Sequence, residues 1–300
     1  MPNKEIIQRP LTHFFQTFKD EMNVADHMEF FCNHKTDEGE TSLRIETYDS
    51  EKLSRVVMEE YSVKSKMKGS VIMTLPMPDN DVPIFFFQIG GRGNRSIAVL
   101  DISPTLKRTD YAPLIPVYEK YHKALGLGDS KVAWLERVCS PYLLHCQYDE
   151  IDCDLFIEAM EAYLDVWIEH YYRPGKGLED PREIDAVTNA IYKFKYVLHH
   201  HDPAYGIFAK SWGKRVADAF VYLECSDHPA YRPPEQLESR VKPWNNPELN
   251  VEWTENAQLL AMETPESELQ ALRSAMEERA RANDYGIITP EIFTRFSETA

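Results

Sequence analysis

The sequence predicts an α+β protein, arranged as a three-layer α/β/α sandwich around a central antiparallel sheet. Three β-rich runs follow one another at 69–76, 83–90 and 96–104. The segments that join them are too short to contain a crossover helix, and short connections favour antiparallel pairing. Helical periodicity occurs both before and after these runs, so we expect helices to cover both faces of the sheet.

Three elements are predicted before the β-rich runs. Apolar residues at helical spacing, including Phe14 and Phe18, predict a helix over 10–22 that begins at a proline. A strand is predicted over 42–48. Apolar residues three and four positions apart then predict a second helix over about 50–61.

The later part of the chain combines helices with one more strand. A helix that includes Val117, Tyr121 and Leu125 precedes a strand predicted over 140–147. Three longer helices follow at 152–172, from Pro181 onward and from about 205 to 223. Each has a wide apolar face, as expected of helices that pack against a sheet.

The composition excludes several classes of protein. The chain has 300 residues, of which 43% are apolar, so it can bury a core and is not disordered. Its formal charge of −16 repels phosphate backbones and anionic lipids, so we expect neither nucleic acid nor a membrane surface as a partner. No apolar run is long enough to span a bilayer, and the N-terminus has no signal-peptide pattern.

The five cysteines include no C-x-x-C pair and do not form an even set. They therefore indicate a reducing compartment rather than a disulfide framework or a structural zinc site. We expect a cytoplasmic protein, or one of the plastid stroma if a transit peptide has been removed.

Composition changes after Cys225, which divides the chain into a body of residues 1–225 and a tail of residues 226–300. The tail has 14 acidic and 7 basic residues, a formal charge of −7. Its first part is rich in proline and asparagine and predicts an extended strap, followed by a helix over 264–283. The tail has too few apolar residues for a core of its own, so we expect it to pack on the body or on a partner.

Four groups able to exchange protons or to bind a metal follow one another at the predicted end of a long helix: His199, His200, His201 and Asp202. We expect no metal site, because adjacent helical residues point about 100° apart and cannot all face one ion. Two interpretations remain open. In the first, the histidines only complement the dipole at the end of the helix. In the second, either Asp202 or one of the histidines points into a pocket and acts as a proton donor.

The second β-rich run contains three consecutive aromatic residues, 85–87, followed by Gln88. Consecutive aromatic residues cover both faces of a strand, which is expected either between two helical layers or between helices and a flat hydrophobic ligand. Asp101 is a carboxylate in the otherwise apolar third run, so it must be hydrogen-bonded or functional.

The order and spacing of these segments resemble the ferredoxin-dependent bilin reductase family, which reduces biliverdin and related open-chain tetrapyrroles. The resemblance covers about residues 40–225. It includes RIETYDSEKLSRVV before a strand, Pro83 before the aromatic run, then AVLDISP, and SPYLL before a long helix. Its most specific part is HDPAYGIFAKSWGKRVADAFVY, in which DPAYG (202–206) matches the family's Asp-Pro-Ala-x-Gly turn and WGKRVA (212–217) lies in the helix that follows.

The resemblance implies an α/β/α sandwich in which the bilin lies between the sheet and the C-terminal helices. It also implies that ferredoxin supplies electrons one at a time through a bilin radical, that pocket acids supply protons, and that no metal or flavin is bound. Asp202 is the implied main proton donor, with His200 or His201 as a further one. The implied activity is the reduction of biliverdin or a dihydrobiliverdin.

The chain departs from the family pattern at three positions. Gln88 stands where the family usually has its central catalytic Asp, Val71 where phycocyanobilin-forming members have a His, and Gln147 where an Arg often holds a propionate. Glutamine can orient a bilin by hydrogen bonds but cannot donate a proton by titrating. We therefore expect Gln88 to orient the tetrapyrrole. The expected substrate-binding residues are Val71, Phe86, Ser96 and Gln147.

These departures leave two alternatives to a reductase. One is a non-catalytic carrier, derived from the reductase fold, that binds a bilin without reducing it. The other is a scaffold that uses the acidic tail to bind a partner.

An acidic ferredoxin needs a basic surface on this acidic protein. The candidate residues are Lys64, Lys66, Lys68, Arg92, Arg95, Lys107 and Arg108. The alternative is that these charges only solvate an exposed face.

Overall fold

The computed structural model describes residues 4–24, 28–37, 39–64, 66–92, 95–128, 132, 135, 138–201 and 250–252. Its strands form one antiparallel sheet in the order β7-β6-β5-β4-β3-β2-β1-β8. The strands are β1 (Met28–Thr36), β2 (Gly39–Tyr48), β3 (Leu53–Val63), β4 (Met67–Pro76), β5 (Ile84–Arg92), β6 (Arg95–Ser103), β7 (Leu144–Asp149) and β8 (Asn250–Glu252). The predicted antiparallel sheet is confirmed.

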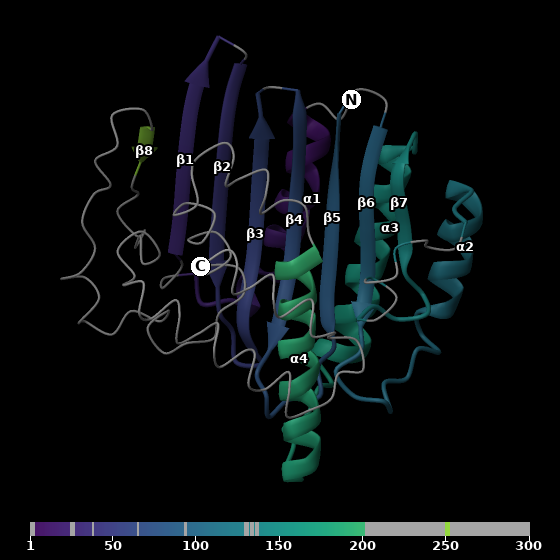
Figure 1. The fold of residues 1–300 in the computed structure, drawn as a ribbon. Coiled ribbons are helices and arrows are strands. Elements are labelled where there is room, and N and C mark those ends of the chain that lie inside the picture. The colour runs from purple at the N-terminus through teal and green to yellow at the C-terminus, as the bar shows by residue number, and fades with distance from the viewer. Residues whose placement is uncertain are drawn as a thin grey trace, which may run out of the picture.

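Helices cover both faces of this sheet, which confirms the three-layer α/β/α arrangement (Figure 1). In the view of Figure 1, α1 (Lys4–Phe18) and α3 (Cys153–Trp167) lie behind the sheet, and α4 (Pro181–His201) lies in front of it. A 3₁₀ turn (Lys19–Glu21) follows α1, a π-helical turn (Ile168–Tyr172) continues α3, and α2 (Ile115–Leu125) packs beside α3. We call the two sides of the sheet the α3 face and the α4 face.

The main hydrophobic core lies between the α3 face of the sheet and helices α1 and α3. The ring of Phe18 contacts those of Trp167 and Tyr172, with centroids 5.4 and 4.7 Å apart. Trp167 also contacts Phe85 at 5.8 Å, and its indole N–H donates a hydrogen bond to the carbonyl of Pro83 at 2.8 Å. These contacts bury large rings with their polar group satisfied, and they hold α3 against the start of β5.

β5 is buried on both sides. Phe85 and Phe87 lie on the α3 face, where Phe87 stacks with Phe156 of α3 at 6.0 Å. Phe86 lies on the α4 face and meets Phe194 of α4 edge-on at 5.4 Å. Consecutive aromatic residues therefore cover both faces of the strand, as expected from the sequence.

The predicted helix over 50–61 is wrong, because this segment forms β3. β3 lies inside the sheet, where Val56 on the α3 face and Val57 on the α4 face are both fully buried. Burial of both faces makes consecutive positions apolar, and the resulting spacing also fits a helix. The adjacent β-branched valines were the local signal for a strand.

The N-terminal helix also differs from its prediction, because α1 begins at Lys4 and Pro10 lies inside it. Ile7 and Phe14, on either side of the proline, are 1% and 0% exposed. Their burial on the same core holds the helix together past the hydrogen bond that proline removes. β1 was not predicted, and β7 begins at Leu144 rather than at 140.

Lys52 joins the β2–β3 connection to the end of the π-helical turn. Its ammonium group donates hydrogen bonds to the carbonyls of Tyr172, Arg173 and Gly175 at 2.9, 2.9 and 2.8 Å. Carbonyls at the end of a helix have no partner within it, and this lysine binds three carbonyls at and just beyond that end.

A second polar contact positions the start of α4. Arg108, which follows β6, donates from Nε to a carboxylate oxygen of Glu183 on α4 at 2.8 Å and lies 3.7 Å from Asp81. Asp81 in turn accepts a hydrogen bond from the backbone N–H of Lys176 at 2.7 Å. This chain of contacts links α4 to the connections at one end of the sheet.

β8 belongs to the tail and pairs with residues 31–33 of β1, so the tail adds a strand to the edge of the sheet. The helices predicted over 205–223 and 264–283 lie outside the described residues. Within the described part of the chain, no helix is both long and apolar enough to cross a membrane.

Candidate functional site

A row of side chains from five strands crosses the α4 face of the sheet. In this row Gln88 of β5 lies between Val71 of β4 and Val99 of β6. Val71 lies opposite Glu59 of β3, and Val99 lies opposite His145 of β7. Paired residues share a face and neighbouring strands lie about 4.8 Å apart, so Glu59 and His145 are each about 10 Å from Gln88.

The side chains around Gln88 are apolar. Val71 and Val99 are 6% and 2% exposed, and Phe86 is buried against Phe194 of α4. Gln88 itself is partly buried. Its amide therefore offers one donor group and one acceptor in apolar surroundings between the sheet and α4, which suits a flat ligand with a few polar atoms.

The two outer members of the row are titratable residues that sequence reasoning did not select. Glu59 is 2% exposed, and His145 is partly buried. Burial lowers the pKa of His145 below its ordinary value of 6.5. Neither residue stands in a motif, because it is the register of the strands that places them beside Gln88.

Tyr61 is a third residue that sequence reasoning missed. A Cβ atom at Gly69 would lie 2.3 Å from Cζ of its ring, and one at Gly90 would lie 2.6 Å from its hydroxyl. The ring therefore occupies the space that two glycines leave open on neighbouring strands. Because Gly90 is two residues beyond Gln88 on the same face, the phenol lies beside the row. The two strand glycines were the available sequence signal.

Asp101 of β6 is fully buried and hydrogen-bonded. It accepts hydrogen bonds from the hydroxyl of Ser103 at 2.5 Å, and from the hydroxyl and backbone N–H of Ser140 at 2.6 and 2.9 Å. Desolvation by burial raises the pKa of Asp101 above its ordinary value of 3.8, although these hydrogen bonds act to lower it. Asp101 thus joins β6 to the segment that leads into β7 and His145.

The structure brings most of the expected substrate-binding residues to one face. Val71, Phe86 and Gln88 lie together on the α4 face. Gln147 lies on the same face two residues beyond His145 and is exposed.

The remaining site residues are not brought into this group. Ser96 lies on the α3 face, where its hydroxyl is hydrogen-bonded to Cys153 at the start of α3. His200 and His201 are the last residues of α4, for which the structure describes the backbone alone. Asp202 lies outside the described residues.

Five of the seven basic residues selected from the sequence gather at one end of the sheet. Lys64 and Lys66 lie in the β3–β4 turn, and Arg92 pairs with Arg95 at the β5–β6 turn. The two turns lie at the same end of the sheet, at the top in Figure 1, and Lys68 lies between them on β4. Lys107 and Arg108 follow the opposite end of β6, and Arg108 is paired with Asp81 and Glu183.

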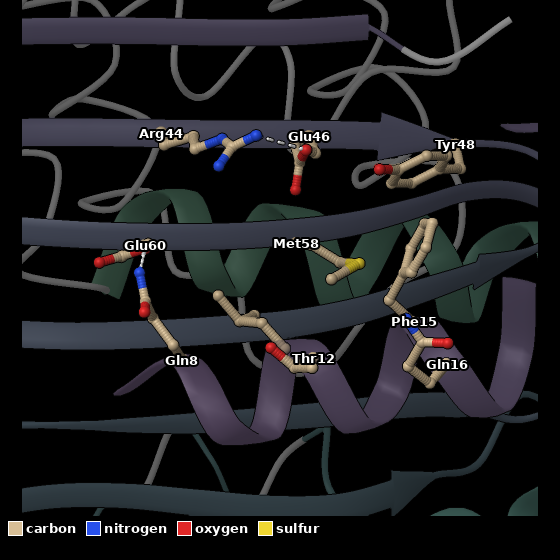
Figure 2. Close-up of a pocket in the computed structure, with 10 residues that line it drawn as sticks. Gln8, Thr12, Phe15, Gln16, Arg44, Glu46, Tyr48, Met58 and Glu60 are labelled. Atoms are coloured by element: carbon tan, nitrogen blue, oxygen red, sulfur yellow. Dashed lines mark hydrogen bonds and ion pairs between the residues drawn. The ribbon is translucent and has the colours of Figure 1, made fainter. Parts of the chain in front are cut away.

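A groove of about 390 Å³ opens on the other side of the sheet, between α1 and strands β2 and β3 (Figure 2). Phe15, Tyr48 and Met58 line one part of it, and polar side chains line the rest. Four of these polar side chains form two pairs. Arg44 pairs with Glu46 at 2.9 Å, and Gln8 donates to Glu60 at 3.2 Å. The groove lies on the α3 face and is separate from the row that contains Gln88.

In the part of the chain that the structure describes, no three His, Cys, Asp or Glu side chains come together as ligands for a metal ion.

Comparisons with known proteins identify the same architecture. The model of a family described as ferredoxin-dependent bilin reductase matches residues 8–223. The crystal structure of selenomethionine phytochromobilin synthase from tomato, in complex with biliverdin, is similar in fold, with a TM-score of 0.61 and 18% sequence identity. The match covers 71% of this chain and 80% of the tomato chain. No curated protein matches the sequence.

Replacing Gly69 by alanine is expected to destabilise the protein by about 1–3 kcal/mol, because the new methyl group overpacks against the ring of Tyr61. This outweighs the roughly 0.4–1 kcal/mol that Gly→Ala gains by restricting the unfolded chain. Urea unfolding measures the loss. The matched control is Gly128→Ala, where a Cβ meets nothing within 4 Å. If Gly69→Ala caused an equal loss of stability in a Tyr61→Ala background, the contact between this position and the ring would be contradicted.

Replacing Asp101 by asparagine is expected to cost about 2 kcal/mol at low pH, because the amide disturbs three buried hydrogen bonds. The pKa of Asp101 is raised in the folded state, so folding favours its protonated form. Its contribution to the free energy of unfolding is therefore complete below the pKa of the unfolded chain, and it is lost as the pH rises through the pKa of the folded protein. The difference in unfolding free energy between wild type and variant should therefore be larger at pH 4 than at pH 8. A difference that grows with pH would contradict this, and the exposed Asp165→Asn is the control.

Proposed function

This chain belongs to the ferredoxin-dependent bilin reductase family, and on that basis we propose that it reduces biliverdin or a dihydrobiliverdin, bound between the α4 face of the sheet and the helical layer in front of it. The observation that carries the proposal is the partly buried amide of Gln88, surrounded by Val71, Val99 and Phe86 on a face covered by α4. Flat apolar contacts and a central hydrogen-bonding group are what a tetrapyrrole requires.

Gln88 orients the pigment in this proposal. Its carbonyl oxygen accepts a hydrogen bond from a pyrrole N–H, and its amino group donates to a lactam oxygen. Because the amide does not titrate near neutral pH, Gln88 leaves proton transfer to other groups. Phe86 and Val71 contact the ring system, and Gln147 binds a propionate at the exposed end of the same face.

Asp202 is the main proton donor in this proposal, and His200 or His201 assists it. His200 and His201 are the last residues of α4, the helix whose Phe194 contacts Phe86, and Asp202 is the next residue in the sequence. Reduction of one double bond consumes two electrons and two protons. Ferredoxin supplies the electrons singly, and the pocket acids supply the protons.

The end of the sheet that carries Lys64, Lys66, Lys68, Arg92 and Arg95 is the proposed docking surface for ferredoxin. The residues cluster although the whole chain has a formal charge of −16. A local basic patch steers an acidic partner, and it does so most strongly at low ionic strength.

The activity is tested by mixing the protein with biliverdin, reduced ferredoxin and a system that regenerates it. We expect a change in the bilin absorption spectrum and a transient radical signal in electron paramagnetic resonance. Asp202→Asn should lower turnover by about 100-fold, because a general acid contributes roughly 10²–10⁴-fold. Asp185→Asn, at an exposed position of α4, is the matched control.

Three outcomes are distinguished by this assay. Biliverdin binding without reduction by the wild type would identify a carrier rather than a reductase. Absence of both binding and reduction would reject the proposed substrate. Full activity of Asp202→Asn would reject that residue as the main proton donor.

The docking surface is tested by charge reversal at the exposed residues Lys64, Lys66 and Arg95. The triple Glu variant should raise the KM for ferredoxin by about 10-fold and weaken its dependence on salt, because the steering attraction is lost. Biliverdin affinity should not change. Reversal of Lys107, Lys123 and Lys176, which are exposed outside this cluster, is the control. Equal effects of the two triple variants would show that only total charge matters.

A further inference from the structure

We propose that His145 is a proton donor to the bilin, acting on the part of the pigment that lies over β6 and β7. This inference rests on the proposed function and adds a catalytic residue to it. Gln88, at the centre of the row, cannot donate a proton by titrating. A bilin over this row must therefore obtain its protons from groups at the sides of the row or on the helices that cover it.

The register of the sheet places His145 in line with Gln88. Val99 separates them, opposite Gln88 on one side and opposite His145 on the other. Two strand spacings amount to about 10 Å, so a tetrapyrrole with its inner rings over Gln88 directs one outer part towards β7. On the other side of Gln88 the corresponding position belongs to Glu59.

The packing of β7 determines the direction of the imidazole. Leu144 and Cys146, on either side of His145, are 0% and 4% exposed and belong to the core on the α3 face. Successive side chains of a strand point to opposite faces, so His145 points to the α4 face. The segment before β7 is held as well, because the hydroxyl of Tyr163 donates to the carbonyl of Tyr142 at 2.8 Å.

Asp101 of β6, a buried acid near β7, does not suit the role of proton donor. Both carboxylate oxygens of Asp101 accept hydrogen bonds from Ser103 and Ser140, and the residue is 0% exposed. His145 is only partly buried, so it can exchange protons with solvent between turnovers. It is therefore the better placed donor at the β7 side of the row.

Ferredoxin, a one-electron donor, reduces the bilin to a radical anion. The negative charge of the radical anion favours the imidazolium of His145, against the lowering of its pKa by burial. The imidazolium transfers its proton to that radical, which breaks an N–H bond of the imidazolium and leaves neutral imidazole. A second electron from ferredoxin and a second proton from another pocket acid complete the reduction of one double bond, and His145 regains its proton from solvent.

A single-turnover experiment tests this role. Biliverdin-loaded wild type, His145→Gln and His122→Gln are mixed with reduced ferredoxin, and the radical signal is followed by electron paramagnetic resonance. The radical should form in all three proteins and decay about 100-fold more slowly in His145→Gln. His122, which is partly buried on α2 beside Tyr118 with ring centroids 5.0 Å apart, is the matched histidine control.

Each result decides the proposal. Slow radical decay in His145→Gln alone supports it. Radical decay at the wild-type rate in His145→Gln overturns the role of His145 and leaves the proposed function standing. Loss of biliverdin binding by His145→Gln also overturns this role, because it assigns His145 to substrate binding. Failure of the wild type to reduce biliverdin overturns the proposed function and this role together. If His145→Gln does not reach the wild-type urea midpoint, His145→Asn is used for the same measurement.

Discussion

The pairing of β5 with β4 and β6 is the constraint on which the rest of the structure depends. It directs Phe85 and Phe87 into the core with α1 and α3, and it directs Phe86 and Gln88 towards α4. A shift of one residue in this register would exchange the two sets and bury the amide in the wrong layer. The large aromatic contacts on the α3 face, above all those of Trp167, oppose such a shift.

The two faces of the sheet consequently differ in the kind of side chain that they carry. The α3 face is packed with rings whose polar groups are satisfied, as in the bond from Trp167 to Pro83, and it provides rigidity. The α4 face carries Glu59, Gln88 and His145 between apolar neighbours. A rigid sheet holds side chains at fixed spacings, which the proposed proton transfer to a bound pigment requires. In the proposed function, Gln88 does not titrate and leaves the proton chemistry to groups away from the centre of this face.

Charge is distributed unevenly over the chain. The tail contributes −7 of the formal −16 and joins the sheet through β8 at the edge formed by β1. The basic cluster occupies the end of β3 to β6, where two turns meet. The proposed docking surface therefore carries a local charge that differs from the total, so the total charge alone is a poor guide to the partner.

The sequence by itself determined the fold class, the antiparallel pairing of the central strands and the family, because short connections, aromatic runs and spaced motifs are local features. It also placed Val71, Phe86 and Gln88, which the structure brings to one face. Only the tertiary structure decided that residues 53–63 form a strand, that Ser96 lies on the other face, and that Glu59, Tyr61 and His145 lie beside Gln88. The physical reason is that register and double burial depend on neighbouring strands, which local periodicity does not specify.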